Sequence, residues 1–169
     1  MIEVDIAVTA IDRARKRASE MPSTLKNSIT KGAGILTGCV GEEVIRDVVG
    51  KSKVKGEFNY EFDFTVKSTG QTMDVKTKST SAVPLPHYDC SVSGHNTKQK
   101  CDNYVFVRIT RDLTKGWVLG YLPKQEFFDL ARFFKKGDSD PSSPNKFTYK
   151  SDTYSVRIDQ LKDINLLVA

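Results

Sequence analysis

The chain has 169 residues, a length that suits one folded domain with a buried core. Hydrophobic residues make up 38% and charged residues 28%, a balance that excludes an intrinsically disordered chain and a membrane protein. No apolar run approaches the roughly 20 residues that a bilayer span needs, and no secretory signal is visible at the start. Lys and Arg exceed Asp and Glu by five, which permits a polyanionic partner without requiring one.

The first part of the sequence predicts helices. Apolar residues recur near helical spacing over residues 5–21, and a break follows at Pro22. A short helix is expected at about Leu25–Thr30 and a longer one at Ile35–Val49, with Gly50 as its stop. Residues 11–31 contain six basic and two acidic residues. They would form either a phosphate-binding surface or an ordinary solvated helix face.

The middle of the sequence changes to a period of two. Residues 60–66 alternate aromatic or apolar with polar side chains, and residues 72–78 alternate again after a turn at 68–71. These two segments predict an antiparallel hairpin with Tyr60, Phe62, Phe64 and Val66 facing the core.

The second half predicts further strands around one helix. Residues 79–100 look irregular, as a long functional loop or a short helix. The later elements expected are strands at 104–109 and 117–122, a helix at 124–134, a small hairpin of 147–149 with 154–158, and a docked apolar tail at 161–168. The order indicates an α/β domain built on a central sheet.

Acidic side chains gather on the polar face of the predicted hairpin. Antiparallel pairing brings Asp63 close to Asp74 and Lys76. Two adjacent carboxylates repel each other unless a cation or a proton lies between them. Oxygen ligands of this kind suit Mg²⁺, which commonly binds one or two carboxylates together with substrate phosphates.

The preceding helix adds a candidate. Glu42 lies along the apolar stripe that Ile45 and Val49 continue, so it is expected to face the sheet. A buried glutamate needs a metal or another cation to offset its desolvation. Glu43 is rotated about 100° around the helix, and we expect it to be solvated.

Together these residues carry a resemblance to a known family. Asp63, ten residues, then Asp74-Val75-Lys76 is similar to the active-site signature of the PD-(D/E)xK nuclease superfamily. Gly41-Glu42 resembles its upstream acidic motif, and the hairpin resembles that of phage and bacterial stand-alone members. Phe62 replaces the signature proline, at a position that varies in the superfamily. The resemblance covers residues 35–78 well and the later elements loosely.

The resemblance implies a restriction-endonuclease-like core with a central mixed sheet flanked by helices. Residues 1–169 would form a single nuclease domain with an N-terminal helical extension (1–34), a catalytic core (35–134) and a C-terminal hairpin and tail (135–169). The implied activity is hydrolysis of DNA with Mg²⁺, for which Mn²⁺ would substitute. Localisation would be cytoplasmic, in a host cell if a phage encodes the chain, as a possible homodimer without a nucleotide cofactor.

The same resemblance assigns roles to individual residues. Glu42, Asp63 and Asp74 would be catalytic metal ligands, with the main-chain carbonyl of Val75 as a further ligand. Lys76 would orient or help to deprotonate the attacking water. Lys78 would contact a phosphate or be a solvated lysine. Gln99 would assist the site, as in some relatives, or be a solvated polar residue.

Several alternatives stay open at this point. The hairpin charges would otherwise be ordinary surface charges, and the chain would otherwise be an inactive nucleic-acid-binding module of the same fold or a protein-interaction domain. A zinc site is a further option, because four potential ligands fall close together, although their spacing matches no standard finger: His87, Cys90, His95 and Cys101. The three cysteines, which include Cys39, show no CxxC spacing and are expected to be reduced.

Overall fold

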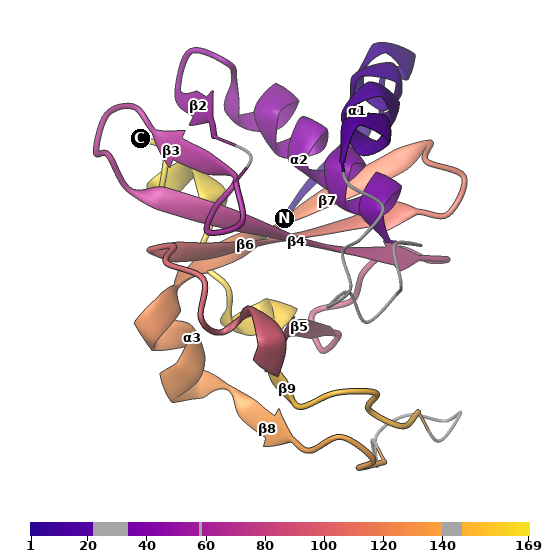
Figure 1. The fold of residues 1–169 in the computed structure, drawn as a ribbon, viewed down its shortest axis with the longest axis vertical. Coiled ribbons are helices and arrows are strands. Elements are labelled where there is room, and N and C mark those ends of the chain that lie inside the picture. Colours follow the sequence, from indigo (N-terminus) through magenta and orange to yellow (C-terminus); the bar gives the residue numbers. More distant parts are fainter. Residues whose placement is uncertain (22–33, 58, 140–146) are drawn as a thin grey trace.

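The computed structural model describes residues 1–21, 34–57, 59–139 and 147–169. In chain order its strands, helices and 3₁₀ helices (η) are β1 (Ile2–Asp5), α1 (Val8–Glu20), α2 (Ile35–Val49), β2 (Val54–Gly56), β3 (Phe64–Val66), β4 (Thr72–Thr80), β5 (Asp89–Ser93), η1 (Gly94–Asn96), β6 (Asn103–Thr110), β7 (Lys115–Pro123), α3 (Lys124–Leu130), β8 (Arg132–Phe134), β9 (Thr153–Arg157), η2 (Ile158–Gln160) and η3 (Ile164–Leu166). The fold is mixed α/β, as the sequence predicts (Figure 1).

Two sheets organise the described residues. The main sheet has six strands in the order β1-β7-β6-β4-β3-β2, and the small sheet has three in the order β5-β9-β8. The main sheet is mixed, because β4 runs parallel to β6 from Met73↔Asn103 to Thr80↔Thr110, while its other pairs are antiparallel. A parallel pair needs a crossover, and the chain makes it through β5 and η1.

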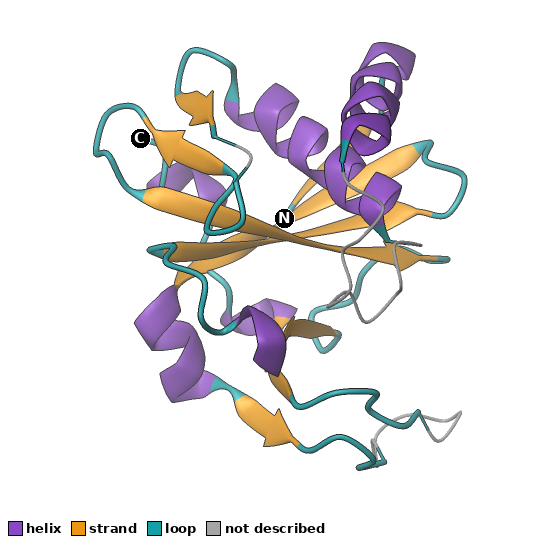
Figure 2. Cartoon of the chain, in the orientation of Figure 1, coloured by secondary structure: helices purple, strands orange, loops and turns teal. Residues whose placement is uncertain are grey.

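The main sheet separates two layers. Helices α1 and α2 cover one face, and α3 and the small sheet lie on the other (Figure 2). Strand β6 shows how the sequence builds both layers. Val105, Val107 and Ile109 belong to the core under α1 and α2, whereas Tyr104 and Phe106 belong to the core with α3. Both faces of this strand are buried, as expected for a central strand with cover on each side.

Several predicted elements are confirmed. Helix α2 spans the predicted Ile35–Val49 and ends at Gly50, whose φ of 95° favours glycine. The hairpin forms between β3 and β4 with Phe64 opposite Met73. Two central strands are also in place as β6 and β7, and the tail docks through Ile164, Leu167 and Val168.

Other predictions are wrong in their boundaries or partners. The predicted strand at 60–66 forms only over Phe64–Val66, and Tyr60 is 74% exposed instead of core-facing. The helix predicted at 124–134 ends at Leu130, and its last residues form β8. Residues 79–100 contain β5, and Ile2–Asp5 forms β1 beside β7, so the segment 1–34 is not helical throughout.

The predicted C-terminal hairpin is also corrected. Strand β9 pairs with β5 and β8, not with residues 147–149. The predicted helix at Leu25–Thr30 lies outside the described residues. No helix among the described residues is long and apolar enough to cross a membrane.

Candidate functional site

A close approach of α2 to β4 positions the first acid. A Cβ on Gly41 would lie only 1.9 Å from Thr77 Oγ1, so a glycine is needed where the helix crosses the strand. A Cβ on Gly38, one turn earlier, would meet nothing within 4 Å. The helix therefore touches β4 at the residue directly before Glu42, which is buried with 8% exposure.

The second acid is fixed by the end of the β3–β4 hairpin. The backbone amide of Asp63 donates to the carbonyl of Met73 at 2.9 Å. Its side chain turns back to the same strand, where Asp63 Oδ2 accepts a hydrogen bond from the amide of Val75 at 2.7 Å. Because β3 begins only at Phe64, the edge of β4 beyond that point is open for this carboxylate. Asp63 is thus held against the strand that contains Asp74, as the sequence predicts.

Three side chains form a closed triangle beside the second strand of the hairpin. Lys76 Nζ lies 2.5 Å from Asp74 Oδ2 and donates to Gln99 Oε1 at 2.7 Å. Gln99 Nε2 in turn donates to Asp74 Oδ1 at 2.8 Å. Two further contacts hold Gln99 from outside the triangle. Lys124 Nζ donates to the backbone carbonyl of Gln99, and Gln99 Nε2 donates to the backbone carbonyl of Tyr60. The triangle fixes both the acid and the ammonium group.

Gln99 is therefore part of the site rather than a solvated polar residue. The sequence contained only a weak signal for it, because 23 residues separate it from Lys76. Its place depends on the crossover between β4 and β6, which returns the chain to the start of β6 beside the start of β4. Its hydrogen bonds to both Asp74 and Lys76 hold these two charged groups together.

The electrostatics show that the three acids form one cluster. Burial, and after it the negative charges of Asp63 and Asp74, raise the pKa of Glu42 to about 9 although Arg17 acts to lower it. Burial and then the charge of Asp74 raise the pKa of Asp63 to about 7, against the hydrogen bond from Val75. Carboxylates that resist ionisation beside one another are a common feature of catalytic and metal-binding sites.

Cations of the chain itself now balance these acids. Arg17 Nη2 lies 2.5 Å from Glu42 Oε2, as Lys76 does from Asp74 Oδ2. Both carboxylate oxygens are buried and accept no hydrogen bond within the described part of the chain. Each of the two oxygens instead faces a cationic side chain, Arg17 for Glu42 and Lys76 for Asp74.

These residues fit a hard divalent cation. In residues 1–21, 34–57, 59–139 and 147–169, no three His, Cys or carboxylate side chains form a ready-made metal site. Mg²⁺ does not require one, because it is usually held by one or two carboxylates together with water and substrate oxygens. Asp63 and Asp74 supply carboxylates on adjacent segments, and Asp74 and Glu42 each have a buried oxygen that now faces Lys76 or Arg17.

Glu43 corrects the sequence-based prediction. It was expected to be solvated, but it is 2% exposed. Arg13 Nε lies 2.6 Å from Glu43 Oε2, and Arg46 Nη1 lies 3.2 Å from Glu43 Oε1. Arg13 also pairs with Asp47 at 3.0 Å. Two arginines of the basic N-terminal segment, Arg13 and Arg17, therefore bind α2 and do not form an open phosphate-binding face.

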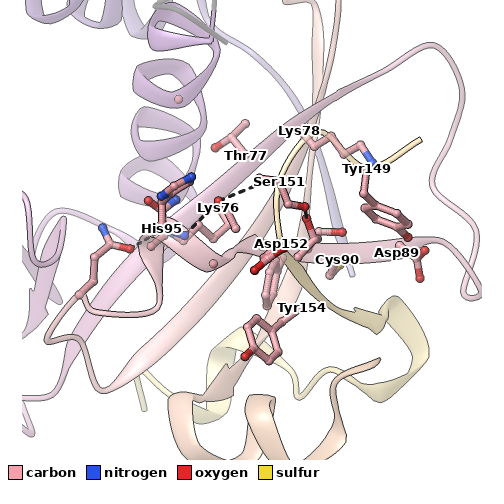
Figure 3. A pocket seen from close by; sticks show the side chains of 18 of the residues that line it. Lys76, Thr77, Lys78, Asp89, Cys90, His95, Tyr149, Ser151, Asp152 and Tyr154 are labelled. Atoms are coloured by element: carbon pink, nitrogen blue, oxygen red, sulfur yellow. Dashed lines mark hydrogen bonds between the residues drawn. The ribbon is translucent and has the colours of Figure 1, made fainter. Parts of the chain in front are cut away.

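The remaining candidates lie near a cleft on the α3 side of β4. Lys76 and Lys78 extend along the strand above Asp152 and Tyr154 of the small-sheet side (Figure 3). Lys78 is exposed on this cleft, as a phosphate contact would require. Cys90 and Cys101 are buried free thiols, whereas His87 and His95 are exposed, so these four do not converge as a zinc site.

Comparison with known proteins adds no assignment. No protein-family model matches the chain, and no curated protein matches it. The arrangement of the residues is therefore what points to a function. It places Glu42, Asp63 and Asp74 in one electrostatic cluster, with Lys76 and Gln99 at its side.

Proposed function

We propose that the chain is a metal-dependent nuclease of the PD-(D/E)xK superfamily, with a restriction-endonuclease-like core, that hydrolyses DNA phosphodiester bonds. One observation carries the proposal: the Asp63 carboxylate is hydrogen-bonded to the strand that presents Asp74 and Lys76. This brings the Asp63 carboxylate to a carboxylate and an ammonium group that lie 11 and 13 positions further along the chain. Glu42 adds a third buried carboxylate from α2.

In this proposal the chain's own residues divide the work. Asp63 and Asp74 would hold Mg²⁺ or Mn²⁺, with the carbonyl of Val75 and a contribution from Glu42. When bound, the cation would polarise the phosphate and lower the pKa of its water. Lys76 would orient the attacking water and balance the charge that develops on the phosphate. Gln99 would hold the side chains of Lys76 and Asp74 in place relative to each other, because it hydrogen-bonds to both.

A second candidate is a nucleic-acid-binding module that does not cleave. The ion pairs favour it, because Arg17 and Lys76 already neutralise two of the acids. A nuclease must release these carboxylates to the metal, whereas a binding module can keep them paired. The two candidates differ in one measurable property, cleavage that depends on a divalent cation.

The test uses labelled plasmid, duplex and single-stranded DNA, each with Mg²⁺, Mn²⁺ or EDTA. The nuclease predicts cleavage that requires the metal and is lost in Asp74→Asn and in Lys76→Met. Asp129→Asn is the matched control, because Asp129 is exposed on α3 away from the site. Binding without cleavage under every metal condition would leave the binding module as the function.

A further inference from the structure

The cleft beside the site is large enough for an extended polymer. Its volume is about 1870 Å³, and it lies between β4 and the small sheet. Lys76 and Gln99, which belong to the triangle with Asp74, form part of its wall. A molecule in the cleft would therefore reach the site directly.

Exposed aromatic side chains of the described residues are confined to this cleft. Among all described Phe, Tyr and Trp residues, the exposed ones are Tyr60 (74%), Phe133 (46%) and Phe147 (48%), and all three line it. Large apolar groups at the surface mark interaction sites when they gather in one place. Aromatic rings that face solvent in a groove are the platforms on which unpaired bases stack.

Two of the three aromatic side chains pack against other rings, and the third residue is tied to the site through its backbone. Phe133 packs on Tyr154, with ring centroids 4.9 Å apart, and Phe147 meets Tyr149 edge to face at 5.2 Å. The backbone carbonyl of Tyr60 accepts a hydrogen bond from Gln99 Nε2 at 3.2 Å, which ties this residue to the site. Held rings lose little conformational entropy when a ligand stacks on them.

The charge of the cleft matches a polyanion. Six Lys or Arg side chains line it, against three carboxylates: Glu61, Asp89 and Asp152. Two of these acids already have cationic partners, since Arg132 lies 2.6 Å from Asp89 and Lys100 lies 3.1 Å from Glu61. The lysines on the surface of the cleft are Lys78, Lys98, Lys136 and Lys150. An excess of lysine around aromatic rings attracts phosphates while the rings take the bases.

We infer that this cleft binds single-stranded DNA, with its phosphates on the lysines and its bases on Tyr60, Phe133 and Phe147. The inference rests on the proposed nuclease function, whose substrate it narrows to unpaired strands. A duplex would meet the lysines equally well, but its base faces are covered by stacking and cannot reach the rings. The aromatic side chains are therefore what separates a single strand from a duplex here.

The experiment measures binding in EDTA by fluorescence anisotropy, with three probes of equal length: oligothymidylate, an abasic oligomer that keeps the phosphates, and a duplex. We expect the wild type to bind oligothymidylate most tightly. The double variant Phe133→Ala/Phe147→Ala should lose at least about tenfold in affinity for it and little for the other two probes. Leu130→Ala is the matched control, because Leu130 is 42% exposed and does not line the cleft.

The inference is overturned if the wild type binds the abasic oligomer or the duplex as tightly as oligothymidylate, or if the double variant binds oligothymidylate unchanged. Circular dichroism confirms folding of each variant, and both Phe side chains are exposed enough for the fold to persist. Metal-dependent cleavage is assayed separately. Phe-dependent binding without cleavage would refute the nuclease and leave the cleft assignment standing. Cleavage that does not depend on Phe133 and Phe147 would refute the cleft assignment and leave the nuclease proposal standing.

Discussion

The Asp63 carboxylate accepts a hydrogen bond from the backbone amide of Val75 at 2.7 Å. This bond joins the residue directly before β3 to β4 and holds an acid whose pKa is raised to about 7. Burial and the charge of Asp74 oppose its ionisation, so the folded chain carries an electrostatic strain when metal is absent.

Asp63→Asn should stabilise the metal-free protein at alkaline pH. The pKa of Asp63 is raised in the folded state from its ordinary 3.8, so the folded chain binds this proton more tightly than the unfolded chain. Stability of the wild type therefore falls as pH rises from about 4 through about 7. Asparagine keeps an oxygen for the Val75 amide and has no charge, and should gain roughly 1–3 kcal/mol at pH 8. Urea unfolding at pH 5 and pH 8 checks this, and an equal gain at both pH values would contradict it.

Mg²⁺ should stabilise the wild type and not the site variants. A ligand that binds only the folded state stabilises it by about 2.7 kcal/mol at a hundredfold excess over its Kd. Asp63→Asn and Asp74→Asn each remove one charged ligand of the proposed metal and should abolish most of that increase. Thermal unfolding with and without Mg²⁺ provides the measurement. The control Asp129→Asn should retain the full increase in Tm, and no increase in the wild type would count against a metal site.

Gln99→Leu should slow cleavage by about 10- to 100-fold, as the loss of a group that orients catalytic residues commonly does. Leucine has a similar size but cannot bridge Lys76 and Asp74. Because the bridge acts through those two residues, the pH–rate profile should shift together with the rate. Gln125→Leu on α3 is the matched control and should cleave as the wild type does. A Gln99→Leu rate equal to that control would remove the positioning role.

Gly41→Ala should destabilise the protein by roughly 1–3 kcal/mol, because its new methyl group would overlap Thr77 and force α2 away from β4. Gly38→Ala, in the same helix with nothing within 4 Å of its Cβ, should gain about 0.5–1 kcal/mol from helix propensity. Chemical denaturation compares the two. Opposite signs support the close approach, whereas two gains would show that the helix does not depend on Gly41 to reach the strand. Because Glu42 follows Gly41, Gly41→Ala should also lower cleavage.

Local patterns in the sequence determined much of the fold and part of the site. The helical spacing of apolar residues in α2 and the end of this helix at Gly50 depend only on residues close together in the sequence. The same is true of the hairpin formed by β3 and β4. The alternation within that hairpin was enough to predict that Asp63 lies beside Asp74 and Lys76, because antiparallel pairing leaves little freedom over so few residues. The helical period likewise predicted that Glu42 is buried.

Contacts between distant segments decided the rest. Glu43 is buried because Arg13 and Arg46 pair with it. Arg13 lies 30 residues earlier in the chain, so the helical spacing within α2 does not predict this pairing. Tyr60 is exposed because β3 begins only at Phe64, although the alternation of apolar and polar residues already begins at Tyr60. Gln99 reaches Lys76 only because the crossover between two parallel strands brings it there.

The composition shows an excess of five positive charges, but it does not show which of these charges form ion pairs and which face solvent. Arg13 and Arg17 of the basic N-terminal segment form ion pairs with α2, whereas lysines from separate segments line the cleft. The sequence by itself determined which local elements form and that acids gather at one hairpin. Only the tertiary structure decided which charges are neutralised and which face a ligand, because that depends on pairings across the main sheet and between the two sheets.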